Sequence, residues 1–196
     1  MFLAMIPPPP NFIVGIGGSA GGLNAYKALL EAMPLDTGMA FVVVPHILPT
    51  VAKSLLAEIL SRHTKMPVMV ALSAMPVRPN HVYVCPPNAD LLLEGHTFKI
   101  VSPRTKRNVA VDLFFTSLAE VMRARAIGIV LSGYDGDGSE GCRQIKAKGG
   151  ITFAQDMSAE VNEMPLSAQE TGCVDFVLPP GKIADELQAI GKQFGN

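Results

Sequence analysis

The sequence is poor in charge and in cysteine and has no tryptophan. Charged residues make up 17% of the 196 residues, and the formal net charge is −1. The basic residues form no cluster longer than the one at residues 104–107, so we expect no nucleic-acid binding, which needs a concentrated positive surface. The three cysteines, Cys85, Cys142 and Cys173, are scattered. This argues against a disulfide framework and against a zinc site, and is typical of a reducing compartment.

Long apolar runs are also missing. None reaches the roughly 18 residues of a membrane-spanning helix, and the opening MFLAMIPPPP lacks the positive start and the cleavage site of a signal peptide. We therefore expect a cytoplasmic chain with no membrane insertion. Four consecutive prolines favour a stiff, extended chain, so residues 1–11 are interpreted as a proline-rich lead-in and residues 12–194 as a single domain.

Hydrophobic residues, at 48% of the chain, are arranged in short buried runs that alternate with segments of helical spacing. Continuous β-branched runs are typical of strands buried on both faces. Alternating strands and helices imply right-handed crossovers and a parallel sheet. The pattern predicts an α/β fold with a doubly wound, mainly parallel sheet, a Rossmann-like three-layer arrangement. The predicted strands are residues 12–16, 39–44, 67–72, 127–131, 151–154 and 176–178, and the predicted helices are residues 22–33, 54–62, 111–122, 140–148 and a last one from residue 180.

The middle of the chain has a different pattern. Residues 81–85, 91–93 and 98–101 are short apolar runs separated by the turn-forming stretches PPNAD and EGH. Short runs with such separators favour antiparallel pairing. We therefore expect an inserted antiparallel hairpin or meander in this region.

A glycine-rich stretch, NFIVGIGGSAGGLNAY at residues 11–26, allows two interpretations. Gly15, Gly17 and Ala20 loosely match the dinucleotide fingerprint, but the second predicted strand ends in FVVVPHILP with no acidic residue for a ribose. Gly17, Ser19 and Gly21 match the G-x-S-x-G pattern of a sharp turn that exposes a nucleophilic serine. A nucleotide-binding oxidoreductase is the weaker functional alternative. A glycine-rich turn with no role in catalysis or binding is the purely structural interpretation.

A nucleophilic serine needs a base and an orienting acid. Of the four histidines, His46 directly follows the predicted strand at residues 39–44, whereas we expect His63, His81 and His96 at the surface.

Two acids, Asp135 and Asp137, lie in a glycine-rich loop after the strand at residues 127–131. A carboxylate that only caps a helix is the plainer interpretation of Asp137. Since the carboxyl ends of parallel strands meet at one edge of a sheet, we expect Ser19, His46 and Asp137 on one rim, as in a Ser–His–Asp hydrolase.

These residues give the chain a resemblance to the CheB-type protein-glutamate methylesterases of bacterial chemotaxis. The family pattern G-[AG]-S-[TA]-G-G fits residues 17–22, V-x-H fits residues 44–46, and [LT]-[ST]-G-x-x-x-D-G fits residues 131–138. HVYVCPP, VDLFF, AQD and the IK..GG tail also match, so the resemblance covers about residues 12–190.

The resemblance implies a role for each matched position. Ser19 would be the nucleophile, His46 the general base and Asp137 its orienting carboxylate. Backbone N–H groups near Ala20 and Tyr134 would hold the oxyanion. The chain departs from the family where members often have Met and Gly and this sequence has Tyr134 and Asp135.

The resemblance also implies a substrate and partners. The expected reaction is hydrolysis of γ-glutamyl methyl esters on the cytoplasmic helices of chemoreceptors, with glutamine deamidation in some members and with no metal or organic cofactor. We expect no receiver domain before residue 12, and some stretches resemble versions fused to a CheR-type methyltransferase. A catalytically silent receptor-binding module of the same fold is the alternative.

Overall fold

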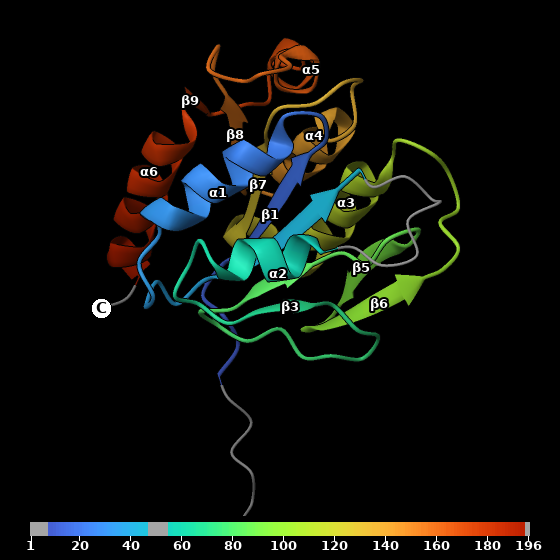
Figure 1. Cartoon of the computed structure of the whole chain (residues 1–196), viewed down its shortest axis with the longest axis vertical. Helices are drawn as coiled ribbons and strands as arrows, with labels where there is room; N and C mark the ends of the chain where they lie inside the picture. Colours follow the sequence, from blue (N-terminus) through green and yellow to red (C-terminus); the bar gives the residue numbers. More distant parts are fainter. Residues whose placement is uncertain (1–7, 47–54, 195–196) are drawn as a thin grey trace, which may run out of the picture.

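The computed structural model describes residues 8–46 and 55–194 and is built around a seven-stranded parallel sheet (Figure 1). Its strand order is β3-β4-β2-β1-β7-β8-β9. The chain first forms β2, β3 and β4 on one side of β1 and then β7, β8 and β9 on the other side, so the strand order reverses at β1. The strands are β1 Ile13–Gly18, β2 Ala40–Pro45, β3 Val68–Val70, β4 Val82–Val84, β7 Ala126–Val130, β8 Ile151–Gln155 and β9 Phe176–Leu178.

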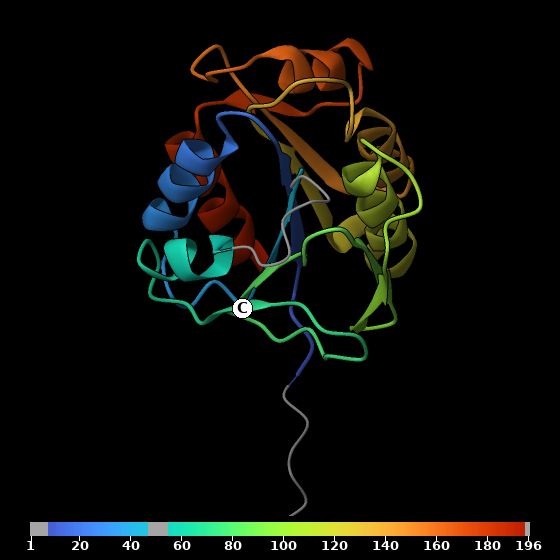
Figure 2. The same cartoon turned by 45° about the vertical axis from the view of Figure 1, so that its right-hand side comes forward.

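Helices cover both faces of this sheet, which confirms the predicted three-layer α/β fold (Figure 2). One core joins α1, α2 and α6 to one face, and a second core joins α3, α4 and α5 to the other. The helices are α1 Gly22–Ala32, α2 Leu56–Ser61, α3 Ala110–Met122, α4 Ser139–Ala147, α5 Glu163–Glu170 and α6 Pro180–Phe194, with a 3₁₀ turn at Arg123–Arg125.

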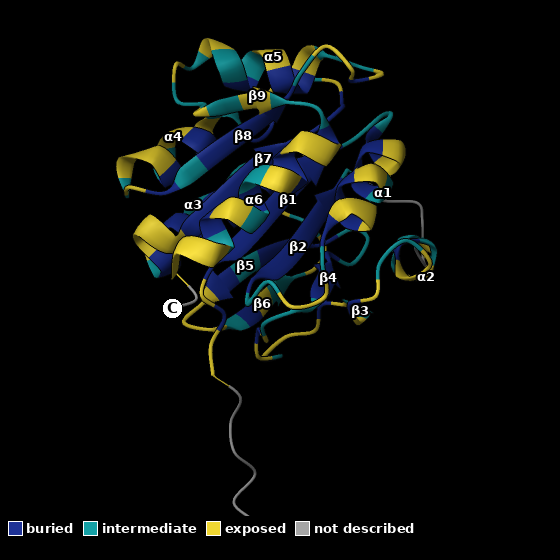
Figure 3. Cartoon of the chain, turned by 90° about the vertical axis from the view of Figure 1, so that its left-hand side faces the viewer, coloured by how far each residue is buried: buried dark blue, intermediate teal, exposed yellow. Residues whose placement is uncertain are grey.

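Burial follows this layering. The central strands are dark throughout in Figure 3, whereas the outer surfaces of the helices are exposed. All six residues of β1 and all six of β2 are buried, because helices pack on both of their faces. Two predicted segments fall partly outside the described residues. These are the lead-in, of which residues 1–7 are not described, and the first residue of the helix predicted at 54–62.

The predicted antiparallel insertion is partly confirmed. β5 Asp90–Glu94 and β6 Thr97–Val101 form a two-stranded antiparallel sheet. The hydroxyl of Ser117 on α3 accepts a hydrogen bond from the backbone N–H of Leu93 at 3.0 Å, which ties this hairpin to the helix.

The grouping of residues 81–85 with that hairpin was wrong. β4 lies in the main sheet, parallel to both β2 and β3. Val82, Tyr83 and Val84 are all buried, so β4 is a short central strand covered on both faces. Its length and its neighbours in sequence resemble those of a meander strand, and only the tertiary pairing distinguishes the two.

Helix α5 was not predicted from the sequence. It is eight residues long and carries Pro165 in its first turn, where the missing N–H costs no helical hydrogen bond. Met164, Pro165 and Ala168 are its buried residues, too few to give a clear helical period. Over the described residues, no helix is both long and apolar enough to cross a membrane.

Candidate active site

Ser19 and His46 directly follow two strands, β1 and β2, that end side by side. Gly18 is paired with Pro45 in the parallel register, so the next residue of each strand is Ser19 and His46. The backbone N–H of His46 donates to the carbonyl of Gly18 at 3.1 Å. This edge is the carboxyl end of the sheet next to the reversal of strand order, where α/β folds bind their ligands.

The nucleophile loop, residues 18–22, is a tight turn from β1 into α1. The N–H of Gly22 donates to the carbonyl of Ser19 at 2.9 Å, and the N–H of Ser19 donates to the carbonyl of Ser132 at 2.8 Å. Gly21 caps α1 with φ of 73°, a left-handed conformation that favours glycine. The glycines therefore serve a strand–turn–helix that presents Ser19, as the G-x-S-x-G pattern predicts.

The acid loop, residues 132–138, runs from β7 into α4 and touches the nucleophile loop at Gly133. A Cβ atom at Gly133 would lie 2.9 Å from the Cβ of Ser19 and 2.2 Å from the sulfur of Met164. Glycine at this position thus allows the two loops to pack directly against each other. Ser132 adds a bond from its hydroxyl to the carbonyl of Ala20 at 2.7 Å.

The structure brings His46 and Asp137 into direct contact. The Nε2 atom of His46 lies 2.5 Å from Oδ2 of Asp137, whose side chain is fully buried. Since a carboxylate can only accept, the hydrogen of this bond belongs to Nε2. The Nδ1 atom of the neutral ring is then the nitrogen that can accept a proton.

Asp137 also caps a helix, but not the one that follows it. Its Oδ2 accepts from the backbone N–H of Val111 at 2.9 Å and its Oδ1 from that of Asp112 at 2.8 Å, both in the first turn of α3. The partial positive charge of a helix N-terminus stabilises a carboxylate there. The same carboxylate therefore caps α3 and contacts the imidazole of His46.

Asp112, in the first turn of α3, caps the start of α4 in the same way. Its Oδ1 accepts from the N–H of Gly138 at 2.9 Å and from that of Gly141 at 2.7 Å. Burial raises the pKa of the Asp112 carboxyl to about 6, and the nearby charge of Asp137 adds to the rise. Sequence reasoning missed this residue, because an acid in the first turn of a helix is common and its partner is 26 residues away.

Asp135 lies on the other side of the imidazole. Its Oδ2 is 3.6 Å from Nδ1 of His46, while its Oδ1 accepts from the N–H of Asp137 at 2.8 Å. The residue has φ of 72°, a left-handed conformation that Asp tolerates better than most residues. Burial raises the pKa of its carboxyl, against the hydrogen bond from Asp137 and the charge of His46.

The remaining predicted groups are Ser19 itself and the backbone donors. Over residues 8–46 and 55–194 the hydroxyl of Ser19 makes no hydrogen bond, and neither do the backbone N–H groups of Ala20 and Tyr134. These three groups are therefore available to a ligand. The other histidines lie away from Asp137: His63 contacts Glu31, His81 bonds the carbonyl of Pro79, and His96 is exposed.

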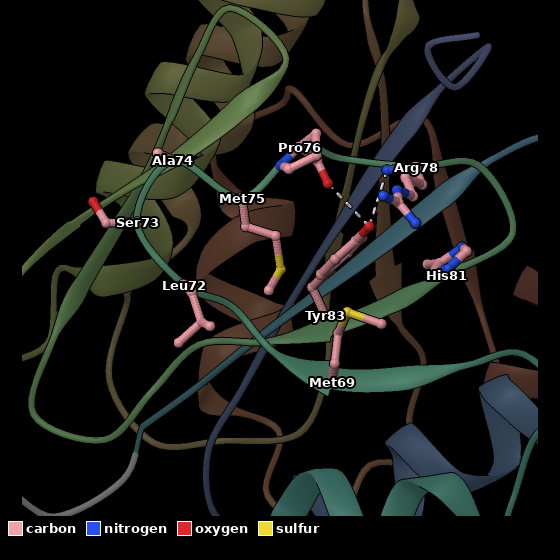
Figure 4. A pocket seen from close by; sticks show the side chains of 9 residues that line it. All are labelled: Met69, Leu72, Ser73, Ala74, Met75, Pro76, Arg78, His81 and Tyr83. Carbon is pink, nitrogen blue, oxygen red and sulfur yellow. Dashed lines mark hydrogen bonds between the residues drawn. The ribbon is translucent and has the colours of Figure 1, made fainter. Parts of the chain in front are cut away.

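A cavity of about 470 Å³ lies against β3 and β4 (Figure 4), and none of its lining residues belongs to this rim. Met69, Leu72 and Met75 give it a mainly apolar lining. The hydroxyl of Tyr83 is already used there, since it accepts from the N–H of Arg78 and donates to the carbonyl of Pro76. Within the described part of the chain, no three His, Cys, Asp or Glu side chains are grouped to hold a metal ion.

A parallel sheet between two helix layers, with a histidine–carboxylate pair beside a serine at its carboxyl edge, is the arrangement of a hydrolytic α/β domain. A family model described as CheB methylesterase matches residues 14–187, and the chain belongs to this family.

Solved and curated relatives agree with this assignment. The crystal structure of the Thermotoga maritima CheB methylesterase catalytic domain superposes with a TM-score of 0.82 at 29% identity, over 91% of this chain and 98% of that one. A putative protein-glutamate methylesterase/protein-glutamine glutaminase of Leptospira interrogans is 35% identical over 87% of this chain and 90% of its own length. A protein-glutamate methylesterase/protein-glutamine glutaminase of Burkholderia lata is also 35% identical, but the chain spans only 57% of its length.

Proposed function

We propose that this chain hydrolyses γ-glutamyl methyl esters on chemoreceptors to glutamate and methanol, with Ser19, His46 and Asp137 as its catalytic residues. The observation that carries the proposal is the 2.5 Å contact between His46 and Asp137, on strand ends that adjoin the loop of Ser19. The names of the curated relatives support the substrate class.

The chemistry follows the geometry of the ring. The Nε2 atom of His46 faces Asp137, so Nδ1 is the nitrogen that takes the proton of Ser19 as its Oγ attacks the ester carbonyl carbon. Asp137 keeps the ring in the tautomer with Nδ1 unprotonated and stabilises the imidazolium that forms. The same imidazolium then protonates the leaving methoxide, and methanol departs.

The negative charge of the tetrahedral intermediate needs donors that are not used elsewhere. The free N–H groups of Ala20 and Tyr134 fill this need, and each such donor contributes about 3 kcal/mol to transition-state stabilisation. Tyr134 acts through its backbone, so the departure from the Met common in the family leaves this function intact. Water, activated by His46, then hydrolyses the acyl-serine, and no step requires a metal or an organic cofactor.

Glutamine deamidation is a second reaction that the same site supports. The curated relatives are named for both activities, and an amide passes through the same acyl-serine with ammonia in place of methanol. We propose the cytoplasmic helices of methylated chemoreceptors as the partner, in the cytoplasm. Fusion to a CheR-type methyltransferase stays a prediction.

Release of methanol from a methylated chemoreceptor tests the proposal. Ser19→Ala should reduce release to the residual level that binding and the oxyanion donors provide, about 10³-fold above uncatalysed hydrolysis, with an unchanged circular dichroism spectrum. Ser73→Ala, at an exposed serine of the distant cavity, is the matched control and should keep full activity. Undiminished release by Ser19→Ala would refute the nucleophile. No release by the wild type would favour the silent receptor-binding module.

A further inference from the structure

The imidazole of His46 lies between two carboxylates of one loop. Asp137 bonds Nε2, and Oδ2 of Asp135 stands 3.6 Å from Nδ1. The side chain of His46 is 9% exposed and that of Asp135 is 28% exposed, so solvent screens this second pair only in part. Nδ1 is also the nitrogen that takes the proton of Ser19 in the hydrolysis proposed above.

A carboxylate at this place has a defined effect on each protonation state of the ring. When Nδ1 carries a proton, the ring is an imidazolium and Asp135 attracts it. When Nδ1 is unprotonated, its lone pair and the carboxylate gain nothing from each other. The charge of Asp135 therefore favours the protonated ring, the state that forms when Ser19 attacks and that must donate to the leaving group.

We propose that Asp135 is a positioning residue for His46, a second carboxylate that holds the ring from the side of Nδ1 and stabilises it after it has taken the proton of Ser19. This role rests on the proposed function.

A test must distinguish the effect of Asp135 on His46 from the effects of other charges nearby. The charges of Asp137, in the acid loop, and of Glu163, at the start of α5, act on the carboxyl of Asp135. Asp112, in the first turn of α3, interacts with the charge of Asp137. Glu163 is exposed and, among the described residues, the side chain of His46 pairs with Asp135 and Asp137 and not with Glu163. Neutralising Glu163 thus changes the local field without removing the contact with the ring.

The turn itself can be preserved while the charge is removed. Asp135→Asn keeps an oxygen that can accept from the N–H of Asp137, as Oδ1 does now, and Asn adopts the left-handed conformation readily. Asp135→Gly removes both the charge and this bond. A change shared by both variants is due to the charge, and one seen only with Gly is due to the turn.

The experiment follows the ring of His46 by NMR in the full chain over pH 5–9, together with the pH dependence of kcat/KM for methanol release. In Asp135→Asn we expect the pH of half-titration of the ring signals, and the rising limb of kcat/KM, to move down by about half a pH unit or more. The activity plateau should fall far less than in Asp137→Asn. Glu163→Gln, the matched control, should move neither curve by a comparable amount.

Each outcome decides the proposal. Coincident titrations of wild type and Asp135→Asn would overturn it, and so would an equal shift in Glu163→Gln or a shift confined to Asp135→Gly. The ring titration needs no turnover. Undiminished methanol release by Ser19→Ala would therefore refute the proposed function while leaving the contact between Asp135 and His46 measurable in its own right.

Discussion

The nucleophile loop and the acid loop touch each other but are held in different ways. Backbone hydrogen bonds fix the nucleophile loop, from Ser19 to the carbonyl of Ser132 and from Gly22 back to Ser19. The acid loop also has backbone bonds, at Gly133, but adds carboxylates, with Asp137 on the first turn of α3 and Asp112 on the first turn of α4. The hydrogen bonds that hold the nucleophile loop are thus made by uncharged groups, whereas the imidazole of His46 bonds a carboxylate.

Asp137→Asn should have the largest effect of the changes in the acid loop, a loss of roughly 10⁴ in turnover. The two oxygens of Asp137 now accept from His46, Val111 and Asp112. An amide has only one oxygen, so whichever way it points its NH2 group replaces one of these acceptors, and the negative charge that stabilises the imidazolium is lost. Methanol release by the variant measures the effect, and thermal unfolding shows how much is due to the helix.

Asp135→Asn is the change to compare with Asp137→Asn, because it also removes a carboxylate charge of the acid loop that lies beside the imidazole of His46. It should cost far less turnover than Asp137→Asn. A larger loss in Asp135→Asn than in Asp137→Asn would make Asp135 the orienting carboxylate. It would contradict the roles proposed for Asp137 at Nε2 and for Asp135 at Nδ1.

Gly133→Ala should break the contact between the two loops. The new methyl group would lie within 3.0 Å of both the Cβ and the backbone nitrogen of Ser19, so Ser19 must move. Misplacement of a reacting group by about 1 Å can cost 10²-fold in rate, and we expect a loss of 10- to 100-fold in kcat/KM.

Gly136→Ala is the control in the same loop. The nearest atom to its new methyl group would be 3.7 Å away, on Ser167, so activity should be unchanged. Equal activity of the two alanine variants would show that the close approach at Gly133 does not position the nucleophile.

Asp112→Asn should have the smallest effect, on the pH dependence of stability. The pKa of the Asp112 carboxyl is raised from 3.8 to about 6 in the folded protein, so between these values the folded protein holds a proton that the unfolded chain has released. Ionising Asp112 therefore costs stability, and its contribution falls as the pH rises from 4 to 6. Asn keeps an oxygen for Gly138 and Gly141 but does not ionise.

The melting temperature of the wild type relative to Asp112→Asn should accordingly fall by roughly 5 °C between pH 4 and pH 6.5. Thermal unfolding of both proteins over this range measures it. A constant difference, or one that grows with pH, would mean that the raised pKa of Asp112 does not couple to folding.

Local patterns were sufficient to predict where the candidate catalytic residues lie along the fold. Ser19, His46 and Asp137 each follow an apolar run, and parallel strands bring their carboxyl ends to one edge, so the rim follows from the strand assignments alone. The structure confirms the contact between His46 and Asp137, whereas the nucleophilic role of Ser19 stays a prediction.

What the patterns missed depends on distant pairing. The placement of β4 between β2 and β3 is set by tertiary register, since its short apolar run would suit a meander equally well. The exchange of caps between Asp137 and Asp112 joins two helix ends that are far apart in sequence, and neither acid alone signals it. The contact between Asp135 and His46 depends on a left-handed turn that the sequence leaves open.

Covalent labelling of the full chain tests the central claim, the nucleophilic role of Ser19, most directly. A fluorophosphonate reacts with a serine whose base is in place, and peptide mass spectrometry then locates the adduct. We predict one adduct, on Ser19, that is strongly reduced in His46→Ala and absent in Ser19→Ala. Absence of any adduct on the folded wild type, or an adduct on another serine such as Ser132, would contradict the assignment of Ser19.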